Sequence, residues 1–234
     1  MTKLRIAGMM RLAEIDQHKL GKDLMRMSIS MLAEKVSHLY FLQIGNIDED
    51  VMSHINSLEI PVKITPSGVD YLSGWMFRNN ESLHDLYKTI DGDFDWILYP
   101  DADDLLPENI LDIVDAANSA GADTIRMYFI ECFGSSDKII EVNEGFPIGP
   151  HFKAVRLRED IGFMGSDGFN EARCDNGLIR YETNYCIRHL RYANPDGIEE
   201  RKKMNYFQEY FLMDHDLLDY SPEKTFDHYR GYKI

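Results

Sequence analysis

One stretch of the chain joins an apolar run to three acidic side chains and then to a helix start: Trp96-Ile97-Leu98-Tyr99-Pro100-Asp101-Ala102-Asp103-Asp104-Leu105-Leu106-Pro107. Its first four residues are typical of a buried β-strand, and Pro107 suits the first turn of a helix. Ligands of open α/β sheets bind where the strands end, so the three carboxylates are expected at a ligand site. Asp101 and Asp103, two residues apart in an extended segment, are expected to point to the same side.

Three carboxylates this close repel one another unless they share a cation. A hard divalent ion, Mg²⁺ or Mn²⁺, bound between them and a phosphate group would relieve that repulsion. A second interpretation is purely structural, because Asp103 and Asp104 also favour the positive end of the helix that follows. That interpretation leaves Asp101 unexplained.

Outward from this stretch, apolar segments of strand and helix type alternate along the first half. The pattern predicts strands at Leu4–Met10, Leu39–Ile44, Pro61–Ile64, Trp96–Tyr99 and Thr124–Phe129. It predicts helices at about 20–31, 49–58, from an Asn80 cap to Gly92, and from Pro107 to about Ala120. Such alternation indicates a Rossmann-like α/β fold with a mainly parallel sheet flanked by helices.

After Cys132 the expected strands are shorter, at Lys138–Val142, His151–Leu157 and Ile179–Arg188. This half is predicted to be antiparallel or mixed, with a charged helix from Ile198 to about His215. No linker separates the halves, so we expect one domain over 1–234, divided into 1–131, 132–207 and a tail at 208–234.

Composition narrows the class of function. The 234 residues include 40 acidic and 25 basic ones, a net charge of −15, which disfavours a nucleic-acid partner. No apolar run approaches the roughly 18 residues of a membrane helix, so no transmembrane segment is expected. The first residues show no leader pattern, and the three cysteines are not closely paired. We therefore expect a cytoplasmic protein.

The acidic stretch is one of four segments that occur in a recognisable order. They are Arg78-Asn79-Asn80 with Gly92-Asp93, then Asp101-Ala102-Asp103-Asp104, Phe169-Asn170-Glu171, and Ile187-Arg188-His189-Leu190-Arg191-Tyr192 with Arg201-Lys202-Lys203. Over about residues 3 to 207 the chain resembles the GT-A glycosyltransferases, in particular the family-2-like inverting enzymes that use nucleotide-sugar donors. The resemblance implies a GT-A fold whose first half, 1–131, binds the nucleotide and whose segment 132–207 carries the acceptor and catalytic residues.

The resemblance also implies a role for each matching position. Asp103 would bind Mn²⁺ or Mg²⁺, with Asp101 binding either the metal or the donor ribose, and His189 would be a late metal ligand. The donor, a UDP-sugar above all, would be bound by Asp101, Arg78, Asn79, Arg201 and Lys202. On the residues alone, His189 also fits a hydrogen-bonded structural histidine, and Arg201-Lys202-Lys203 also fits a solvated helix face.

Inversion by single displacement requires a carboxylate that takes the proton of the acceptor hydroxyl. By the resemblance this base is Glu171, with Asp167 in the Gly-rich loop 162–168 as the second candidate. A structural salt bridge from Glu171 to Arg173 is the alternative. The acceptor is left open: a glycan, a protein, a lipid-linked precursor or a modified nucleic-acid base.

The sequence departs from the family at two points, and other classes are weighed beside it. Met9–Glu14 carries only the acid of the expected Asn-Glu pair, and Arg191 replaces the expected Gly. A haloacid-dehalogenase-type phosphatase would need Thr or Val where Leu105 stands. A nucleotidyltransferase usually opens with a Gly-rich loop, whereas residues 6–13 hold only Gly8. A catalytically inactive GT-A-like binding domain is the non-enzyme alternative.

Overall fold

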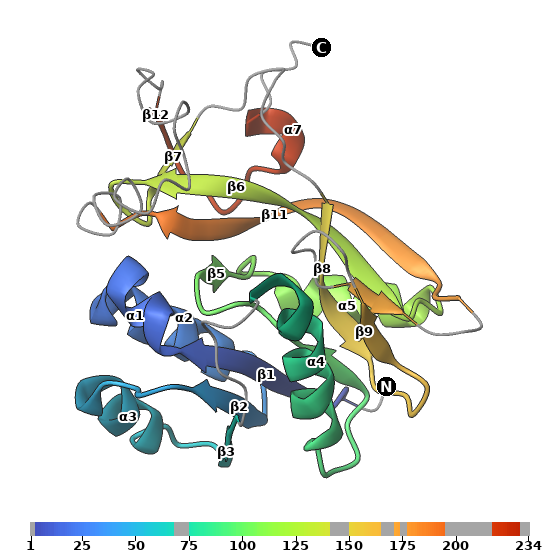
Figure 1. Ribbon diagram of the computed structural model, residues 1–234. Coiled ribbons are helices and arrows are strands. Elements are labelled where there is room, and N and C mark those ends of the chain that lie inside the picture. The colour runs from blue at the N-terminus through green and yellow to red at the C-terminus, as the bar shows by residue number, and fades with distance from the viewer. Residues whose placement is uncertain are drawn as a thin grey trace.

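A large mixed β-sheet with helices on both faces forms the body of the protein (Figure 1). The computed structural model describes residues 3–67, 75–140, 150–164, 171–173, 177–194 and 217–229. This is the α/β architecture that the alternating sequence pattern predicts.

The first half supplies a parallel sheet in the order β4-β1-β2-β3. Its strands are β1 (Ile6–Ala13), β2 (His38–Ile44), β3 (Val62–Pro66) and β4 (Trp96–Leu98). Every residue of β1 is buried, because helices cover both faces of the sheet there. The four predicted strands are confirmed, with β1 extending three residues beyond its predicted end.

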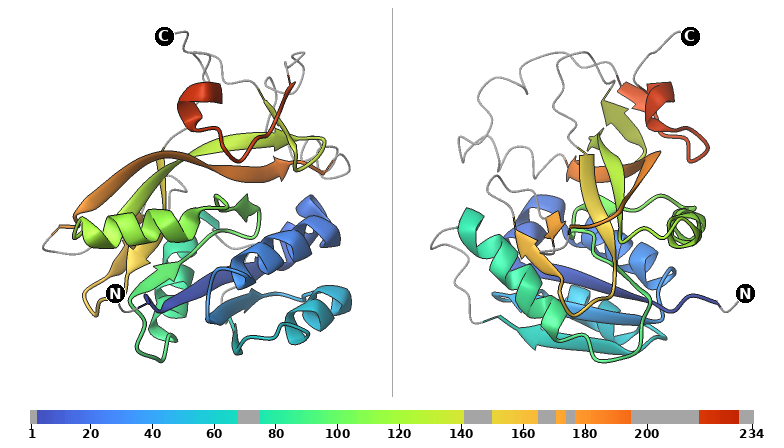
Figure 2. Two further views of the ribbon diagram at one scale, coloured as in Figure 1. Left: turned by 180° about the vertical axis from the view of Figure 1, so that it is seen from behind. Right: turned by 90° about the vertical axis from the view of Figure 1, so that its right-hand side faces the viewer.

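The helices divide between the two faces of this sheet. They are α1 (Glu14–Leu20), α2 (Lys22–Ala33), α3 (Glu49–Asn56), α4 (Trp75–Lys88) and α5 (Ile110–Ser119). The apolar side chains of α2, α3 and α5 pack with one set of strand residues, and those of α4 pack with the alternate set. The right-hand view of Figure 2 shows α4, in teal, and α5, in light green, on opposite sides of the sheet.

Among these helices, one was not predicted, and two predicted helix starts are wrong. An unpredicted α1 precedes α2, because Gly21, at φ +77°, breaks the helical path between them. Helix α4 begins at Trp75, so Asn80 lies inside it rather than at its cap. Helix α5 begins at Ile110, and Pro107 lies in the preceding turn, where its carbonyl accepts the N–H of Ile110.

The second half extends the same sheet with mixed pairing. Strand β8 (Pro150–Arg156) lies between β4 and β6 (Thr124–Phe133) and is antiparallel to both. The long β11 (Arg180–Tyr192) runs parallel to β6. Figure 1 shows β6 and β11 as a pair above the parallel sheet, which confirms the expected mixed character of this half.

Smaller elements complete the described fold. Strands β7 (Lys138–Ile140) and β12 (Leu217–Asp219) pair at one edge, and β9 (Gly162–Met164) pairs with β10 (Glu171–Arg173) as a separate two-stranded sheet. Helix α7 (Phe226–Tyr229) packs near β11. The predicted helix at 198–215 lies outside the described residues. Across the described ranges, none of the helices has both the length and the apolar character that crossing a membrane requires.

A two-residue strand, β5 (Asp104–Leu105), joins the acidic stretch to the second half. It pairs antiparallel with β11, so that Asp104 lies opposite His189 and Leu105 opposite Arg188. The polypeptide that follows β4 is therefore held against a strand more than 80 residues later in the sequence.

Close packing at Gly8 gives a test of the parallel core. A Cβ atom at Gly8 would lie 2.7 Å from Leu39 Cδ2 and 3.1 Å from Leu32 Cδ2, and both leucines are buried. We expect Gly8→Val to lower the free energy of unfolding by about 1–3 kcal/mol, because the added methyl groups overpack the contact between β1, β2 and α2. Urea denaturation measures it, and Leu217→Val on the exposed edge strand should change stability by less than about 0.5 kcal/mol. Equal stabilities for the two variants would contradict this packing.

Candidate metal centre

Backbone hydrogen bonds shape the acidic stretch after β4. The Tyr99 N–H donates to the Lys153 carbonyl at 2.9 Å, which carries the β4–β8 pairing past the end of the strand. The chain then turns, and the Asp104 N–H donates to the Asp101 carbonyl at 3.0 Å. On the other side the Leu190 N–H donates to the Asp103 carbonyl at 2.6 Å. The turn is thereby tied to both β8 and β11.

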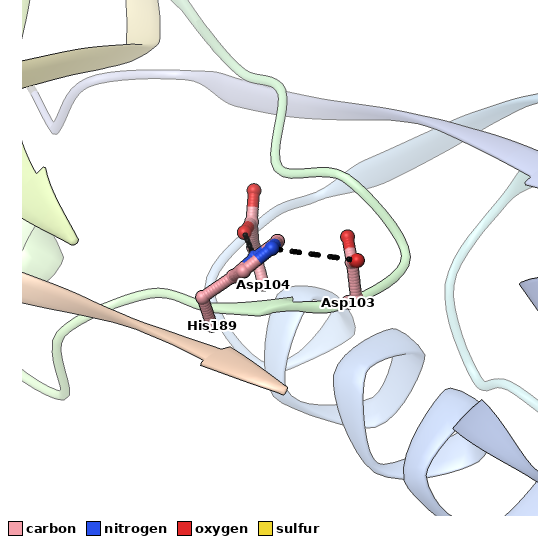
Figure 3. Close-up of side chains that lie close together, drawn as sticks. All are labelled: Asp103, Asp104 and His189. Atoms are coloured by element: carbon pink, nitrogen blue, oxygen red, sulfur yellow. Dashed lines mark hydrogen bonds and ion pairs between the residues drawn. The ribbon is translucent and has the colours of Figure 1, made fainter. Parts of the chain in front are cut away.

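Asp103, Asp104 and His189 form a compact cluster at this turn (Figure 3). Each offers a ligand atom, and these atoms lie within 4.8 Å of one another. His189 Nδ1 is 2.9 Å from Asp104 Oδ1, and His189 Nε2 is 3.6 Å from Asp103 Oδ2. The Asp104 side chain is fully buried, whereas the Asp103 side chain is 22% exposed and accessible to a ligand.

The two ring nitrogens of His189 have different partners. A carboxylate only accepts hydrogen bonds, so the short contact to Asp104 requires the proton on Nδ1. In the neutral ring the lone pair is then on Nε2, which faces Asp103. A carboxylate that holds the far nitrogen of a histidine is the usual support of a metal-ligating imidazole.

This donor set fits a divalent metal ion. Two ligand atoms that each lie about 2.1 Å from a shared ion are at most about 4.2 Å apart, so the 3.6 Å between Nε2 and Oδ2 is bridgeable. Burial disfavours the charged imidazole, but the carboxylates of Asp103, Glu131 and Asp104 outweigh it and raise the pKa of His189 to about 9. The same negative field attracts a metal cation. The cluster can therefore hold a metal ion.

Asp101 lies outside this cluster and has cationic partners of its own. One oxygen contacts the Arg11 guanidinium and the other the Lys153 ammonium. Burial raises the pKa of Asp101, but Lys153 and Arg11 outweigh it and hold the pKa well below its usual range. The acid that the structure brings to His189 beside Asp103 is thus Asp104, and the roles of Asp101 at the metal or the donor ribose stay predictions.

A stack of three rings lies beside the cluster. The Phe129 ring is parallel to both His151 and His189, with ring centroids 3.6 Å and 5.0 Å apart. Burial, and then the nearby Lys153 ammonium, lower the pKa of His151 to about 3. His151 is therefore neutral near pH 7, while the stack fixes the plane of His189.

The side chains of the other predicted site residues lie outside the part of the chain that the structure describes. Arg78 and Asn79 lie in α4, and Glu171 lies in β10, but the side chains of all three are outside the described part. Asp167, and the pair Arg201 and Lys202, lie outside the described residues altogether. Their predicted roles at the donor and as general base stay predictions.

Sequence reasoning missed two cations of the site. Lys153 is a charge in the middle of a strand whose neighbours Phe152 and Ala154 are buried, and Arg11 lies in the fully buried β1. A charged residue within an apolar strand is rarely buried without a partner, so the sequence pattern could have indicated a buried ion pair at each position. Which acids they pair with depends on how β1, β4 and β8 are ordered in the sheet.

Comparison with known proteins gives a likeness at the level of the fold. The sequence matches no family model and no curated protein. The structure is similar to a crystal structure of S. aureus TarS 1-349, with a TM-score of 0.50 and 10% identity over 80% of this chain and 60% of that one. The crystal structure of TarS 1-349 in complex with UDP has a TM-score of 0.46 and 13% identity, over 77% of this chain and 61% of that one. The inositol-1-phosphate CTP transferase from T. maritima has a TM-score of 0.46 and 11% identity, over 89% of this chain and 98% of that one.

The chain thus spans about three fifths of the TarS 1-349 chain. At these identities the likeness concerns the fold alone. The chain has a GT-A-type α/β fold. The resemblance noted from the sequence is confirmed at that level.

Because the pKa of His151 is lowered, we predict that part of the free energy of unfolding is lost at acid pH. The unfolded chain takes up a proton at this ring below about pH 6.5 and the native protein only near pH 3, so stability is lost as pH falls between these values. Between pH 7.5 and pH 5 we expect the wild type to lose about 1–2 kcal/mol more unfolding free energy than His151→Gln. Urea denaturation at several pH values measures this difference. Parallel stability profiles for the two proteins would show that His151 is not held neutral.

Proposed function

We propose that the protein is a metal-dependent, inverting glycosyltransferase, which transfers a sugar from a nucleotide-diphosphate-sugar to an acceptor hydroxyl. The observation that carries this proposal is the cluster of Asp103, Asp104 and His189 beyond the end of β4 in a GT-A-type sheet. Ligands of open α/β sheets bind at this edge.

The charges of the site suit a diphosphate leaving group. Asp103 and His189 would hold Mn²⁺ or Mg²⁺, while Asp104 keeps the His189 ring in place. The mixed imidazole and carboxylate set favours Mn²⁺ of the two ions. When bound, the ion neutralises the negative charge that develops as the sugar leaves the diphosphate.

The proposed donor is carried over from the sequence resemblance. We assign a UDP-sugar as donor, with Arg78, Asn79, Arg201, Lys202 and Asp101 as its contacts. Thermal-shift measurements against UDP-, GDP-, CMP- and dTDP-sugars, with and without Mn²⁺, identify the nucleotide base of the donor.

We also propose that the protein is located in the cytoplasm.

Nucleotidyl transfer is distinguished by its products. A glycosyltransferase releases a nucleoside diphosphate, whereas a nucleotidyltransferase releases pyrophosphate. Phosphorus NMR of the products separates these reactions, and the absence of any turnover with an ordered donor complex would favour an inactive binding domain. A phosphatase is disfavoured because its nucleophile would be Asp101, whose two oxygens are engaged by Arg11 and Lys153.

Metal dependence is the first test. EDTA should abolish donor hydrolysis and transfer, and Mn²⁺ should restore both. Asp103→Ala should lower the rate at least about a hundredfold, because a group that neutralises the leaving diphosphate is lost. Asp115→Ala, on the exposed side of α5, is the matched control and should keep the wild-type rate. Full activity in chelator would exclude the metal role.

The general base is tested separately. Glu171→Gln keeps the shape of the side chain but cannot take a proton, so donor affinity should hold while transfer falls by about 10²- to 10⁴-fold. Asp167→Asn, made in parallel, tests the second candidate. Calorimetry of donor binding and single-turnover transfer assays provide the two readouts. Wild-type transfer by both variants, or a product with retained configuration, would contradict the inverting base.

A further inference from the structure

Lys153 is a buried cation that touches two acids beside the candidate metal site. We propose that Lys153 is a positioning residue: it holds Asp104 so that Asp104 turns Nε2 of His189 toward Asp103. This inference rests on the metal role in the proposed function. Lys153 belongs to β8, whereas the three residues of the cluster come from the turn after β4, from β5 and from β11.

The contacts of Asp104 show how this positioning works. The Lys153 ammonium lies 2.8 Å from Asp104 Oδ2, and the same oxygen accepts the N–H of Asp101 at 2.9 Å. With Oδ2 held from two directions, the other oxygen, Oδ1, is turned toward His189 Nδ1 at 2.9 Å. The Ser28 hydroxyl also donates to the Asp104 carbonyl at 2.9 Å, so the backbone is held as well.

Lys153 also borders the ring that sets the plane of His189. Its Nζ lies 5.5 Å from the centroid of the Phe129 ring, on which His189 stacks. The edge of the imidazole is thus fixed through Asp104 and its face through Phe129, and Lys153 contacts both supports. A short apolar side chain at this place would leave the Asp104 carboxylate with a single anchor on Oδ2.

The charge of Lys153 stabilises the acids that it contacts but by itself opposes the binding of a metal ion. The Lys153 side chain is only 4% exposed, and its positive charge repels a metal ion bound a few ångströms away. Arg11 and Lys153 pair with Asp101 and Asp104, the two acids on either side of Asp103 in the sequence. Removing Lys153 makes the site more negative, and would therefore make it more attractive to a metal if charge were all that mattered.

The sign of the change in metal affinity therefore distinguishes a positioning role of Lys153 from a purely electrostatic effect of its charge. We expect Lys153→Met to weaken the binding of Mn²⁺ alone, without nucleotide, by about 10- to 100-fold, as is typical when the support of a metal-ligating histidine is removed. Calorimetry or electron paramagnetic resonance measures this affinity. Unchanged or tighter Mn²⁺ binding in the variant would overturn the positioning role. Lys153→Gln, which keeps a polar group in the buried site, is used if the Met variant does not fold.

A second readout separates positioning from a general loss of stability. In protein labelled with ¹⁵N-histidine, the Nδ1 proton of His189 should give a downfield, slowly exchanging NMR signal, and Lys153→Met should shift or abolish it. Val155→Ala, a buried truncation on the same strand, should keep both this signal and the Mn²⁺ affinity. Retention of the signal in Lys153→Met would overturn the inference. Failure of the wild type to bind Mn²⁺ would instead reject the metal role in the proposed function.

Discussion

The arrangement of this site depends on the interactions of one buried carboxylate, that of Asp104. It is completely buried, and its two oxygens are bonded to groups from β8, from β11 and from its own turn. Burial raises the pKa of Asp104, but the Lys153 ammonium and the hydrogen bond from His189 outweigh it and keep the pKa below its usual range. An anion buried this deeply is stable only with such partners, so their places are fixed together with it.

This constraint joins the two halves of the chain. Parallel strands β1 to β4 end at one edge of the sheet, and the short β5 turns back to pair with β11. Because β8 is inserted between β4 and β6, a lysine from the second half lies beside acids from the first. The site is therefore made by strand order, rather than by any one segment of sequence.

Charge pairing also separates the roles of neighbouring acids. Asp101 and Asp104 are bonded to buried cations, although the Asp101 side chain is itself partly exposed. Asp103 is the more exposed of the two acids that face His189. Three carboxylates in four residues thus differ in what they can still bind. Of the two acids at His189, Asp103 is the one whose side chain is partly exposed.

The sequence by itself determined the α/β class, the parallel strands of the first half and the position of the acidic turn, because hydrophobic periodicity and turn residues are local properties. It also singled out Asp103 and His189, through a resemblance of ordered motifs. Helix starts at α4 and α5 were misjudged, since packing can hold a cap-type residue such as Asn80 inside a helix, and Pro107 suits a preceding turn as well as a first helical turn. The pairing of Asp101 with Arg11 and Lys153, and of Asp104 with His189, was decided only by the tertiary structure. These partners are 52 to 90 residues apart, and only the order of strands in the sheet brings them into contact.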